Sequence, residues 1–268
     1  MNNAELKSCC AAAYQSDFAR LLLGDSFHRG GLPLTERLGN LLALSPSDHV
    51  LDVACGRGES AIFLATQFGC RVTGIDFGET NVTHATSRAE VANVSTLVRF
   101  KLGDAERLDY PDASFDVVLC ECAFCTFPDK REATREFARV LRLGGRLGLS
   151  DLTRSGELPT ELAGLLAWIA CIADARPVGE YVAYLEQAEF QSMSVEPHDE
   201  ALAQMVRDIQ GRLLAAELMV RLDKMSLLGV DFREAKATAA SAAGAVRSRL
   251  LGYSLITAKK PCAEKLCG

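Results

Sequence analysis

Cysteines are the residues of this sequence whose number and placement point most directly to chemistry. The chain has ten of them among 268 residues. Three fall in one short segment, Cys120-Glu121-Cys122-Ala123-Phe124-Cys125, which follows an apolar run typical of a buried strand. Thiolates are strong nucleophiles and are the preferred ligands of soft ions. This segment is therefore the first candidate for a site that reacts through sulfur or binds a soft ion.

Two other cysteine positions stand in segments that we predict to be helical. Cys10 lies near the N-terminus beside Cys9, and Cys171 lies within 157–187. We expect both segments to fold over the end of the sheet and to approach Cys122.

Two other interpretations of these cysteines stay open. A free cysteine packs well as a small hydrophobic residue, so Cys122 and Cys171 are also candidates for tight packing near a pocket. A zinc site built from Cys120, Cys122 and Cys125 is the second interpretation. Structural zinc usually takes four ligands from paired turns, and alternating residues of a strand point to opposite faces, which both weigh against it.

A glycine-bearing turn and several acids have the spacing of a nucleotide site in an α/β domain. Gly56 and Gly58 follow the apolar run that contains Asp52, and a helix pattern begins directly after them. Glycines let the backbone approach a ligand, and the helix N-terminus presents N–H groups to it. Asp76, after the next strand, is placed to hold ribose hydroxyls. Asp104, after the third, can accept a hydrogen bond from an exocyclic amine such as that of adenine.

Strand and helix patterns alternate between these residues. We predict strands at 49–54, 71–76, 96–103, 115–120, 146–151, 190–197 and 252–259. We predict helices within 4–44, at 59–68, 79–92, 130–141 and 157–187, and along an Ala- and Leu-rich stretch at about 199–249. Such alternation predicts an α/β fold with a doubly wound, mostly parallel seven-stranded sheet.

This organisation divides the chain into four parts. An N-terminal helical lid, in which Gly30, Gly31 and Pro33 break two helical segments, precedes a Rossmann-like core. A helical insertion then caps the acceptor site, and a last strand and tail complete the sheet. The predicted boundaries are 1–44, 45–153, 154–250 and 251–268.

Four segments resemble the class I S-adenosylmethionine-dependent methyltransferases over about residues 48–152. They read VLDVACGRG, GIDFG, LGDAERLDYPDASFDVV and EFARVLRLGGRL. The resemblance implies S-adenosyl-L-methionine as cofactor, with Asp52 near its amino-acid end, Asp76 at the ribose and Asp104 at the adenine. The cofactor-binding residues that it implies are Asp52, Ala54, Gly56, Gly58, Asp76, Phe77, Asp104, Ala105 and Cys120. Ala54 stands where the family has its first glycine. A dehydrogenase-type Rossmann domain fits less well, because the downstream segments have the methyltransferase pattern.

The cysteines add a resemblance to the arsenite methyltransferases over about residues 45–195. Cys122 precedes Pro128-Asp129-Lys130, and Cys171 lies between Leu158-Pro159-Thr160-Glu161-Leu162 and 180–190, in the order and context of that family. The resemblance implies trivalent arsenic held by the thiolates of Cys122 and Cys171, with Cys10 as a third candidate. Glu121 is expected to position the cofactor or to accept a proton. A further family cysteine is replaced here by Ala61.

Other functions remain open. The second hypothesis is methylation of a small thiol, sulfide or selenide, for which cysteine ligands would matter little. A carbon or oxygen methyltransferase acting on a quinone or other metabolite is the third, and it would need a positioned base, for which the sequence offers no clear residue. A non-enzymatic sensor is the fourth, and the full set of cofactor acids argues against it.

Charge and hydropathy narrow the classes of partner. The net charge is −6, and the Lys and Arg residues form no run, which argues against a nucleic-acid partner and favours a small-molecule or metalloid substrate. No uninterrupted apolar stretch has the roughly 18 residues of a membrane span. The first residues do not have the pattern of a signal peptide, so we expect a cytoplasmic protein with reduced thiols. The sequence does not indicate an oligomeric state.

Overall fold

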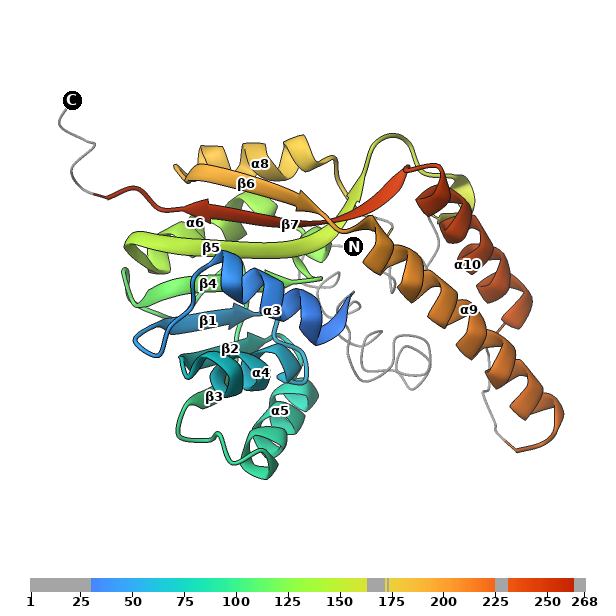
Figure 1. Cartoon of the computed structure of the whole chain (residues 1–268), viewed down its shortest axis with the longest axis horizontal. Helices are drawn as coiled ribbons and strands as arrows, with labels where there is room; N and C mark the ends of the chain where they lie inside the picture. The colour runs from blue at the N-terminus through green and yellow to red at the C-terminus, as the bar shows by residue number, and fades with distance from the viewer. Residues whose placement is uncertain (1–29, 163–171, 173, 225–230, 263–268) are drawn as a thin grey trace.

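A computed structural model describes residues 30–162, 172, 174–224 and 231–262. Seven strands form one sheet in the order β3-β2-β1-β4-β5-β7-β6 (Figure 1). All neighbouring strands from β3 to β5 pair in parallel, and β7 is antiparallel to both of its neighbours. This arrangement confirms the predicted doubly wound, mostly parallel sheet. The strands are β1 (His49–Val53), β2 (Arg71–Asp76), β3 (Val98–Leu102), β4 (Phe115–Glu121), β5 (Leu141–Arg154), β6 (Gln191–Pro197) and β7 (Leu251–Lys259).

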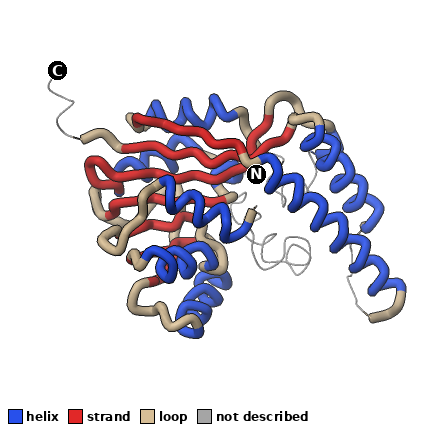
Figure 2. The backbone as a smooth tube through the Cα atoms, in the orientation of Figure 1, coloured by secondary structure: helices blue, strands red, loops and turns tan. Residues whose placement is uncertain are grey.

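Helices cover both faces of the sheet. Figure 1 shows α3 and α4 in front of the sheet and α6 and α8 behind it. A pair formed by α9 and α10 extends away from the sheet on the side toward which the arrow of β1 points (Figures 1 and 2). The helices are α3 (Gly31–Leu41), α4 (Glu59–Phe68), α5 (Glu79–Val91), α6 (Lys130–Val140), α8 (Val178–Gln187), α9 (Asp199–Arg221) and α10 (Phe232–Arg247), with short 3-10 turns η1 (Phe124–Thr126) and η2 (Thr160–Leu162).

Three elements differ from the sequence-based prediction. Helix α3 begins within the predicted break, with Gly30 as its N-cap, and Gly31 and Pro33 lie in its first turn, where a proline costs no hydrogen bond. The helical stretch at 199–249 is two helices, α9 and α10. Strand β5 begins at Leu141, before the predicted strand at 146–151, and includes Gly144 and Gly145.

Some predictions remain untested. Cys10, most of the predicted N-terminal lid and Cys171 lie outside the described residues. The four-part division of the chain also stays a prediction. Of its parts, the predicted helical insertion supplies strand β6 in addition to helices. No helix in the described part of the chain is both long and apolar enough to cross a membrane.

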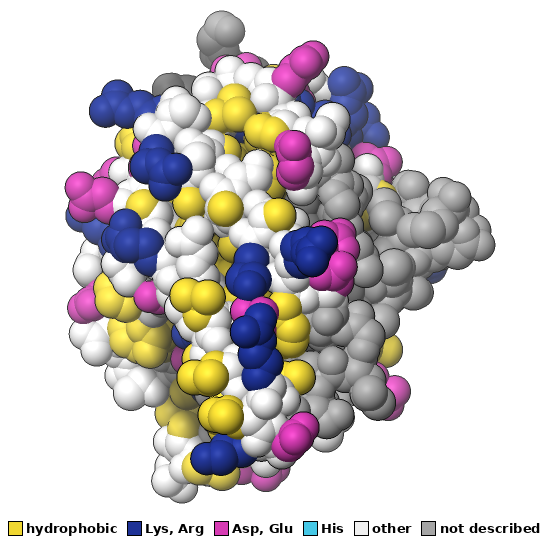
Figure 3. All heavy atoms as spheres, turned by 90° about the vertical axis from the view of Figure 1, so that its right-hand side faces the viewer, with side chains coloured by type: hydrophobic (Ala, Val, Ile, Leu, Met, Phe, Trp, Pro, Cys, Tyr) yellow, Lys and Arg dark blue, Asp and Glu magenta, His cyan; other side chains and the backbone are white. Residues whose placement is uncertain are grey.

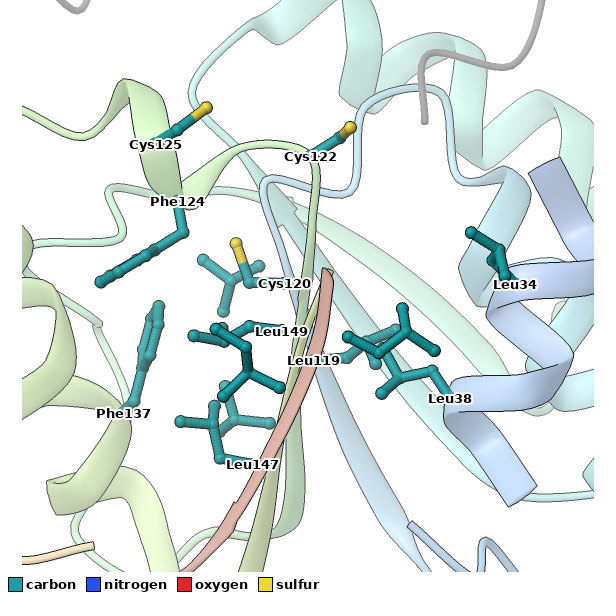
Figure 4. Close-up of a cluster of buried hydrophobic side chains, with 14 of the residues drawn as sticks. Leu34, Leu38, Leu119, Cys120, Cys122, Phe124, Cys125, Phe137, Leu147 and Leu149 are labelled. Atoms are coloured by element: carbon teal, nitrogen blue, oxygen red, sulfur yellow. The ribbon is translucent and has the colours of Figure 1, made fainter. Parts of the chain in front are cut away.

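The core lies on both faces of β4. Figure 4 shows Leu119 facing Leu38 of α3 on one side of the strand, while Cys120 faces Phe137 of α6 on the other. All four side chains are fully buried. Truncating one such large side chain to alanine typically costs about 2–5 kcal/mol. The two-sided packing fixes the position of β4, whose carboxyl end forms part of the site described below.

Side-chain packing by Phe100 of β3 also fixes the turn after β1. Gly58 has a φ of 76° and Gly74 lies in β2, and a Cβ added to either glycine would overlap the ring of Phe100. These two glycines are therefore required by packing beneath the turn. This finding adds a structural reason for Gly58 to the ligand-approach argument made from the sequence.

Replacing Gly58 by alanine should destabilise the protein by about 2 kcal/mol or more, because the new Cβ adds left-handed backbone strain to the overlap with Phe100. Urea unfolding of the ligand-free protein measures this change. Gly211→Ala is the matched control, because Gly211 lies in helix α9 with nothing within 4 Å of the added Cβ. The control should gain about 0.5–1 kcal/mol. Equal midpoints for Gly58→Ala and the wild type would contradict this interpretation.

Candidate active site at the carboxyl ends of the strands

A left-handed backbone turn connects β1 to α4. Ala54, Gly56 and Gly58 all have positive φ, at 57°, 52° and 76°. The Cys55 N–H donates to the Ile75 carbonyl at 2.9 Å, which joins the turn to β2. Ala54 occupies the position where a glycine was expected and bears a left-handed conformation that costs a non-glycine residue roughly 1–2 kcal/mol. Strain retained beside a helix N-terminus is typical of a ligand-binding turn.

Asp76 holds this turn in place from the end of β2. Its Oδ2 accepts from the Gly56 N–H at 2.8 Å, and its Oδ1 accepts from the Gly78 N–H at 2.8 Å and from Asn81 Nδ2 at 3.0 Å. Burial raises the pKa of this carboxyl group, and these three hydrogen bonds oppose that rise. Since Oδ2 accepts only one of these bonds, it retains a lone pair for a ligand hydroxyl.

Asp52 is a buried acid with an unused acceptor atom. Its side chain lies in β1 and is 2% exposed, and its Oδ2 has no hydrogen-bond partner in the described part of the chain. Burial raises the pKa of its carboxyl group well above the usual range, and the nearby charges of Glu121 and Asp76 raise it further. An orphaned buried acceptor in a negative environment fits a cationic ligand group that donates hydrogen bonds.

Glu121 stands at the end of β4 and is surrounded by hydroxyl donors. Its carboxylate accepts from Ser60 Oγ at 2.6 Å, from Thr35 Oγ1 at 3.0 Å and from Ser150 Oγ at 3.3 Å. These donors belong to α4, α3 and β5. Glu121 therefore links three elements around the same edge of the sheet.

A chain of hydrogen bonds leads from Cys122 to Glu121. The Cys122 Sγ lies 3.5 Å from the Tyr253 Oη, and Tyr253 donates to Ser150 Oγ at 3.0 Å. Ser150 in turn donates to Glu121. Because the donor directions of Tyr253 and Ser150 are set by the carboxylate, the Cys122 thiol donates to Tyr253. Cys122 itself is 8% exposed and has a left-handed φ of 56°.

The ends of β2 and β3 complete the edge. Phe77, directly after Asp76, is 42% exposed. The Gly103 N–H donates to the Asp76 carbonyl at 3.0 Å, which holds the end of β3 against β2. Asp104 Oδ1 then accepts from the Glu106 N–H at 3.0 Å and shapes the turn that contains half-buried Ala105. These residues lie where the sequence predicted them.

Cys120 is the predicted cofactor residue whose side chain the structure does not bring to this group. It is fully buried on the opposite face of β4, next to Phe124 and Leu149 (Figure 4), and burial raises its thiol pKa well above the usual range. The zinc interpretation finds no support, because no three His, Cys, Asp or Glu side chains among the described residues are placed to hold a metal ion.

Four polar residues of the site were missed in the sequence. Ser150 pairs with Glu121 in the register of β4 and β5, so a strand alignment would have placed it. Ser60 stands two residues after Gly58, at the start of α4, and helix N-termini favour such hydroxyls. Thr35 and Tyr253 reach the site from distant parts of the chain, and no local pattern indicates them.

Comparison with known proteins decides the family. A family described as "Methyltransferase domain" matches residues 51–149. The 27-O-demethylrifamycin SV methyltransferase of Amycolatopsis mediterranei is 35% identical over 238 residues, which cover 85% of this chain and 83% of that protein. The chain is a class I S-adenosylmethionine-dependent methyltransferase. The arsenite methyltransferase of Halobacterium salinarum is 31% identical over 163 residues, which cover 59% of this methyltransferase and 41% of that protein.

Solved structures agree on the fold. Phosphoethanolamine N-methyltransferase 2 of Haemonchus contortus, in complex with phosphomonomethylethanolamine and S-adenosylhomocysteine, superposes with a TM-score of 0.80 and 17% identity. That alignment covers 96% of this methyltransferase and 60% of the other chain. A putative sarcosine dimethylglycine methyltransferase of Galdieria sulphuraria superposes with a TM-score of 0.74 and 18% identity, over 86% of both chains.

The site fits the cofactor of this family, S-adenosyl-L-methionine. That molecule carries an ammonium and a sulfonium group, and the orphaned Asp52 Oδ2 is an acceptor for a cationic donor. The free lone pair of Asp76 suits a ribose hydroxyl. Once bound, the cofactor supplies an electrophilic methyl group. On the face shown in Figure 3, the described Lys and Arg side chains are interspersed with Asp and Glu, and they form no continuous basic surface there.

Asp52→Asn should make the ligand-free enzyme more stable at neutral pH, by about 1–2 kcal/mol. The pKa of Asp52 is raised in the folded state, so wild-type stability should fall as pH rises above the usual aspartate value of about 4. The variant should show a weaker fall, because Asp76 still contributes one. Thermal unfolding across pH, together with calorimetric cofactor titration, measures both this gain and the expected loss of affinity.

Asp48→Asn is the control of opposite sign. Asp48 is also buried, but it pairs with Arg146 and accepts from Ser45 Oγ at 2.9 Å. Breaking such a buried pair should cost roughly 3 kcal/mol. If Asp52→Asn destabilised the enzyme as strongly as this control, the assignment of an unpartnered acid at position 52 would be wrong.

Proposed function

We propose that this enzyme methylates a hydroxyl oxygen of a bulky natural product related to polyketides. The observation that carries this proposal is the similarity to the 27-O-demethylrifamycin SV methyltransferase over most of both chains. The unaligned 15% of this chain is shorter than the segment from α9 to α10, so the similarity extends into the helix pair. The alignment with the arsenite methyltransferase leaves 41% of the chain uncovered.

The placement of the helix pair supports a bulky acceptor. In parallel α/β sheets, ligands bind beyond the carboxyl ends of the strands. The pair of α9 and α10 extends from that side of the sheet (Figure 1). Its start is fixed to β7, because the Tyr253 N–H donates to Asp199 Oδ1 at 3.1 Å and the His198 N–H donates to the Tyr253 carbonyl at 2.7 Å. The pair would form a wall for a large substrate.

The cofactor is held, in this proposal, by residues of the turn after β1 and of the ends of β2 and β3. Asp52 receives the ammonium group, Asp76 the ribose, and Asp104 the adenine amine, with Phe77 beside the ring. The full set is Asp52, Ala54, Gly56, Gly58, Asp76, Phe77, Asp104 and Ala105. Cys120 is left out because its side chain faces the other side of the sheet.

A hydroxyl acceptor must lose its proton when its oxygen forms the new bond to the methyl carbon. The chain from Cys122 through Tyr253 and Ser150 ends on the Glu121 carboxylate. The acceptor hydroxyl would donate to Cys122, and a concerted shift of protons along the chain would leave one proton on Glu121 when the acceptor oxygen takes up the methyl group. This path supplies the base that could not be identified from the sequence.

Arsenite stays the second candidate acceptor. Cys122 stands at the carboxyl end of β4, where that hypothesis needs a thiol, but its partners Cys171 and Cys10 lie outside the described residues. Small thiols and sulfide also remain candidate acceptors. The proposals differ in what Cys122 does, since a metalloid ligand needs its sulfur directly whereas the hydroxyl proposal needs only a hydrogen-bonding group.

Methyl transfer from labelled cofactor should occur to a polyketide bearing a free hydroxyl, such as 27-O-demethylrifamycin SV, and not to arsenite, methanethiol or sulfide. Cys122→Ser should retain at least about a tenth of the activity, because serine preserves a hydrogen-bonding group at the end of the chain. Arsenic methylation that disappears in Cys122→Ser would replace the hydroxyl proposal by the metalloid one.

Tyr253→Phe interrupts the hydrogen-bond chain and should lower kcat about 10²-fold, with little change in KM or in cofactor affinity. Tyr181→Phe is the matched control. Tyr181 is equally buried, and its hydroxyl donates to the Leu152 carbonyl at 3.0 Å, outside this chain. The control should keep its kcat and the wild-type pH profile. Equal losses of kcat in the two variants would show that Tyr253 serves packing alone.

A further inference from the structure

We infer that the carboxylate of Glu121 strengthens binding of the positively charged cofactor relative to that of its product, whose sulfur carries no charge. The reaction converts a sulfonium into a thioether and leaves the ammonium and carboxylate of the cofactor unchanged. The two molecules therefore differ only at the sulfur, by a methyl group and a positive charge, and a carboxylate close to the sulfur responds to the charge. This inference concerns the cofactor and does not depend on the identity of the acceptor.

The first observation is a cluster of three buried acids without cationic partners among the described residues. Asp52, Asp76 and Glu121 are all buried at the ends of β1, β2 and β4. Ion pairs elsewhere use other acids, such as Asp48 with Arg146 and Asp174 with Lys130. Within the described residues, no Lys, Arg or His forms an ion pair with any of these three carboxylates. A buried cluster of acids in surroundings of low dielectric constant favours a cation strongly.

The second observation is the unpartnered Oδ2 of Asp52, whose side chain is almost completely buried. An acceptor that remains unsatisfied inside the protein indicates that a ligand completes it. Burial and repulsion from Glu121 and Asp76 both raise the Asp52 pKa. The site is therefore under electrostatic repulsion that a bound cation relieves.

Position distinguishes Glu121 from the other two acids. Leu119 pairs with Asp52 in the register of β1 and β4, so Glu121 lies two residues, or about 6–7 Å, further along the strand direction. It is thus nearer to the edge where the acceptor must approach the methyl group. Asp76 is held on the other side of β1 by the turn that it braces.

The hydroxyl cluster supplies the hydrogen bonds that a buried carboxylate needs. Ser60, Thr35 and Ser150 each donate to the Glu121 carboxylate, and Tyr253 orients Ser150 by donating to it. Hydrogen bonds from neutral donors stabilise a buried carboxylate in its charged form without cancelling its charge. A Lys or Arg in the same place would neutralise it and remove the discrimination.

The test is calorimetric titration of the full-length protein with S-adenosyl-L-methionine and with S-adenosylhomocysteine. In Glu121→Gln, the affinity for the cofactor should fall about 10- to 100-fold more than the affinity for the product. Glu121→Asp keeps the charge and should restore most of the wild-type ratio of the two affinities. Asp116→Asn is the matched control at the opposite end of β4 and should leave the ratio unchanged.

Each outcome decides the inference. A selective loss of cofactor affinity that Glu121→Asp reverses supports it. Equal losses for cofactor and product would show that Glu121 only shapes the site, and an unchanged ratio would show that its charge is not felt at the sulfur; both results overturn it. If Glu121→Gln does not fold, Glu121→Ser takes its place as the uncharged variant, because serine also forms hydrogen bonds with the surrounding hydroxyl groups. The same ratio of cofactor to product affinity is then compared with that of the wild type and of Glu121→Asp.

Discussion

The burial of carboxyl groups that have no cationic partner among the described residues is the constraint on which the site depends. Asp52 and Asp76 lie at the ends of adjacent parallel strands, with Glu121 on the next strand beyond Asp52. A folded protein tolerates such a cluster only if the carboxylates are hydrogen-bonded, protonated or completed by a ligand. The three acids differ in how their carboxyl groups are hydrogen-bonded. Asp76 is satisfied by backbone N–H groups, Glu121 by side-chain hydroxyls, and Asp52 retains an unused oxygen.

The rest of the fold keeps these three acids and their hydrogen-bond partners in place. The Asp76 carboxylate fixes the left-handed turn that begins α4, while Phe100 packs beneath Gly58 and Gly74. The hydroxyl groups around Glu121 come from three elements, α3, α4 and β5. Two-sided packing of β4 keeps the end of that strand in place. The energetic cost of the acids is offset by the surrounding core, as expected where function opposes stability.

Much of this could be predicted from local patterns in the sequence. The strands that end in Asp52 and Asp76 are short apolar runs, and the spacing of the glycine turn to both acids indicates a nucleotide-type site. Strand and helix periods predicted the sheet, although α3 begins before Pro33 and β5 begins before Gly144, because glycine and proline also occur inside elements. Tertiary packing decides such cases, and propensity does not.

The parts that could not be predicted depend on long-range contacts. The roles of Thr35 and Tyr253 follow from hydrogen bonds to residues 86 and 103 positions away along the chain. The three cysteines at the end of β4 appeared equivalent in the sequence, but the structure separates them. Cys120 packs against the α6 face, whereas Cys122 joins a polar chain to Glu121. This separation shifts the emphasis from sulfur ligands to carboxylates.

The central claim is that the Asp52 carboxyl group, whose pKa is raised in the ligand-free protein, loses its proton when it binds the cationic end of the cofactor. Calorimetric binding of S-adenosyl-L-methionine in buffers of different ionisation enthalpy tests it most directly, because it counts the protons released on binding. The account predicts net proton release from the wild type at some pH between about 5 and 8, and its loss in Asp52→Asn. Binding without proton release throughout this range, or equal release by the variant, would contradict it.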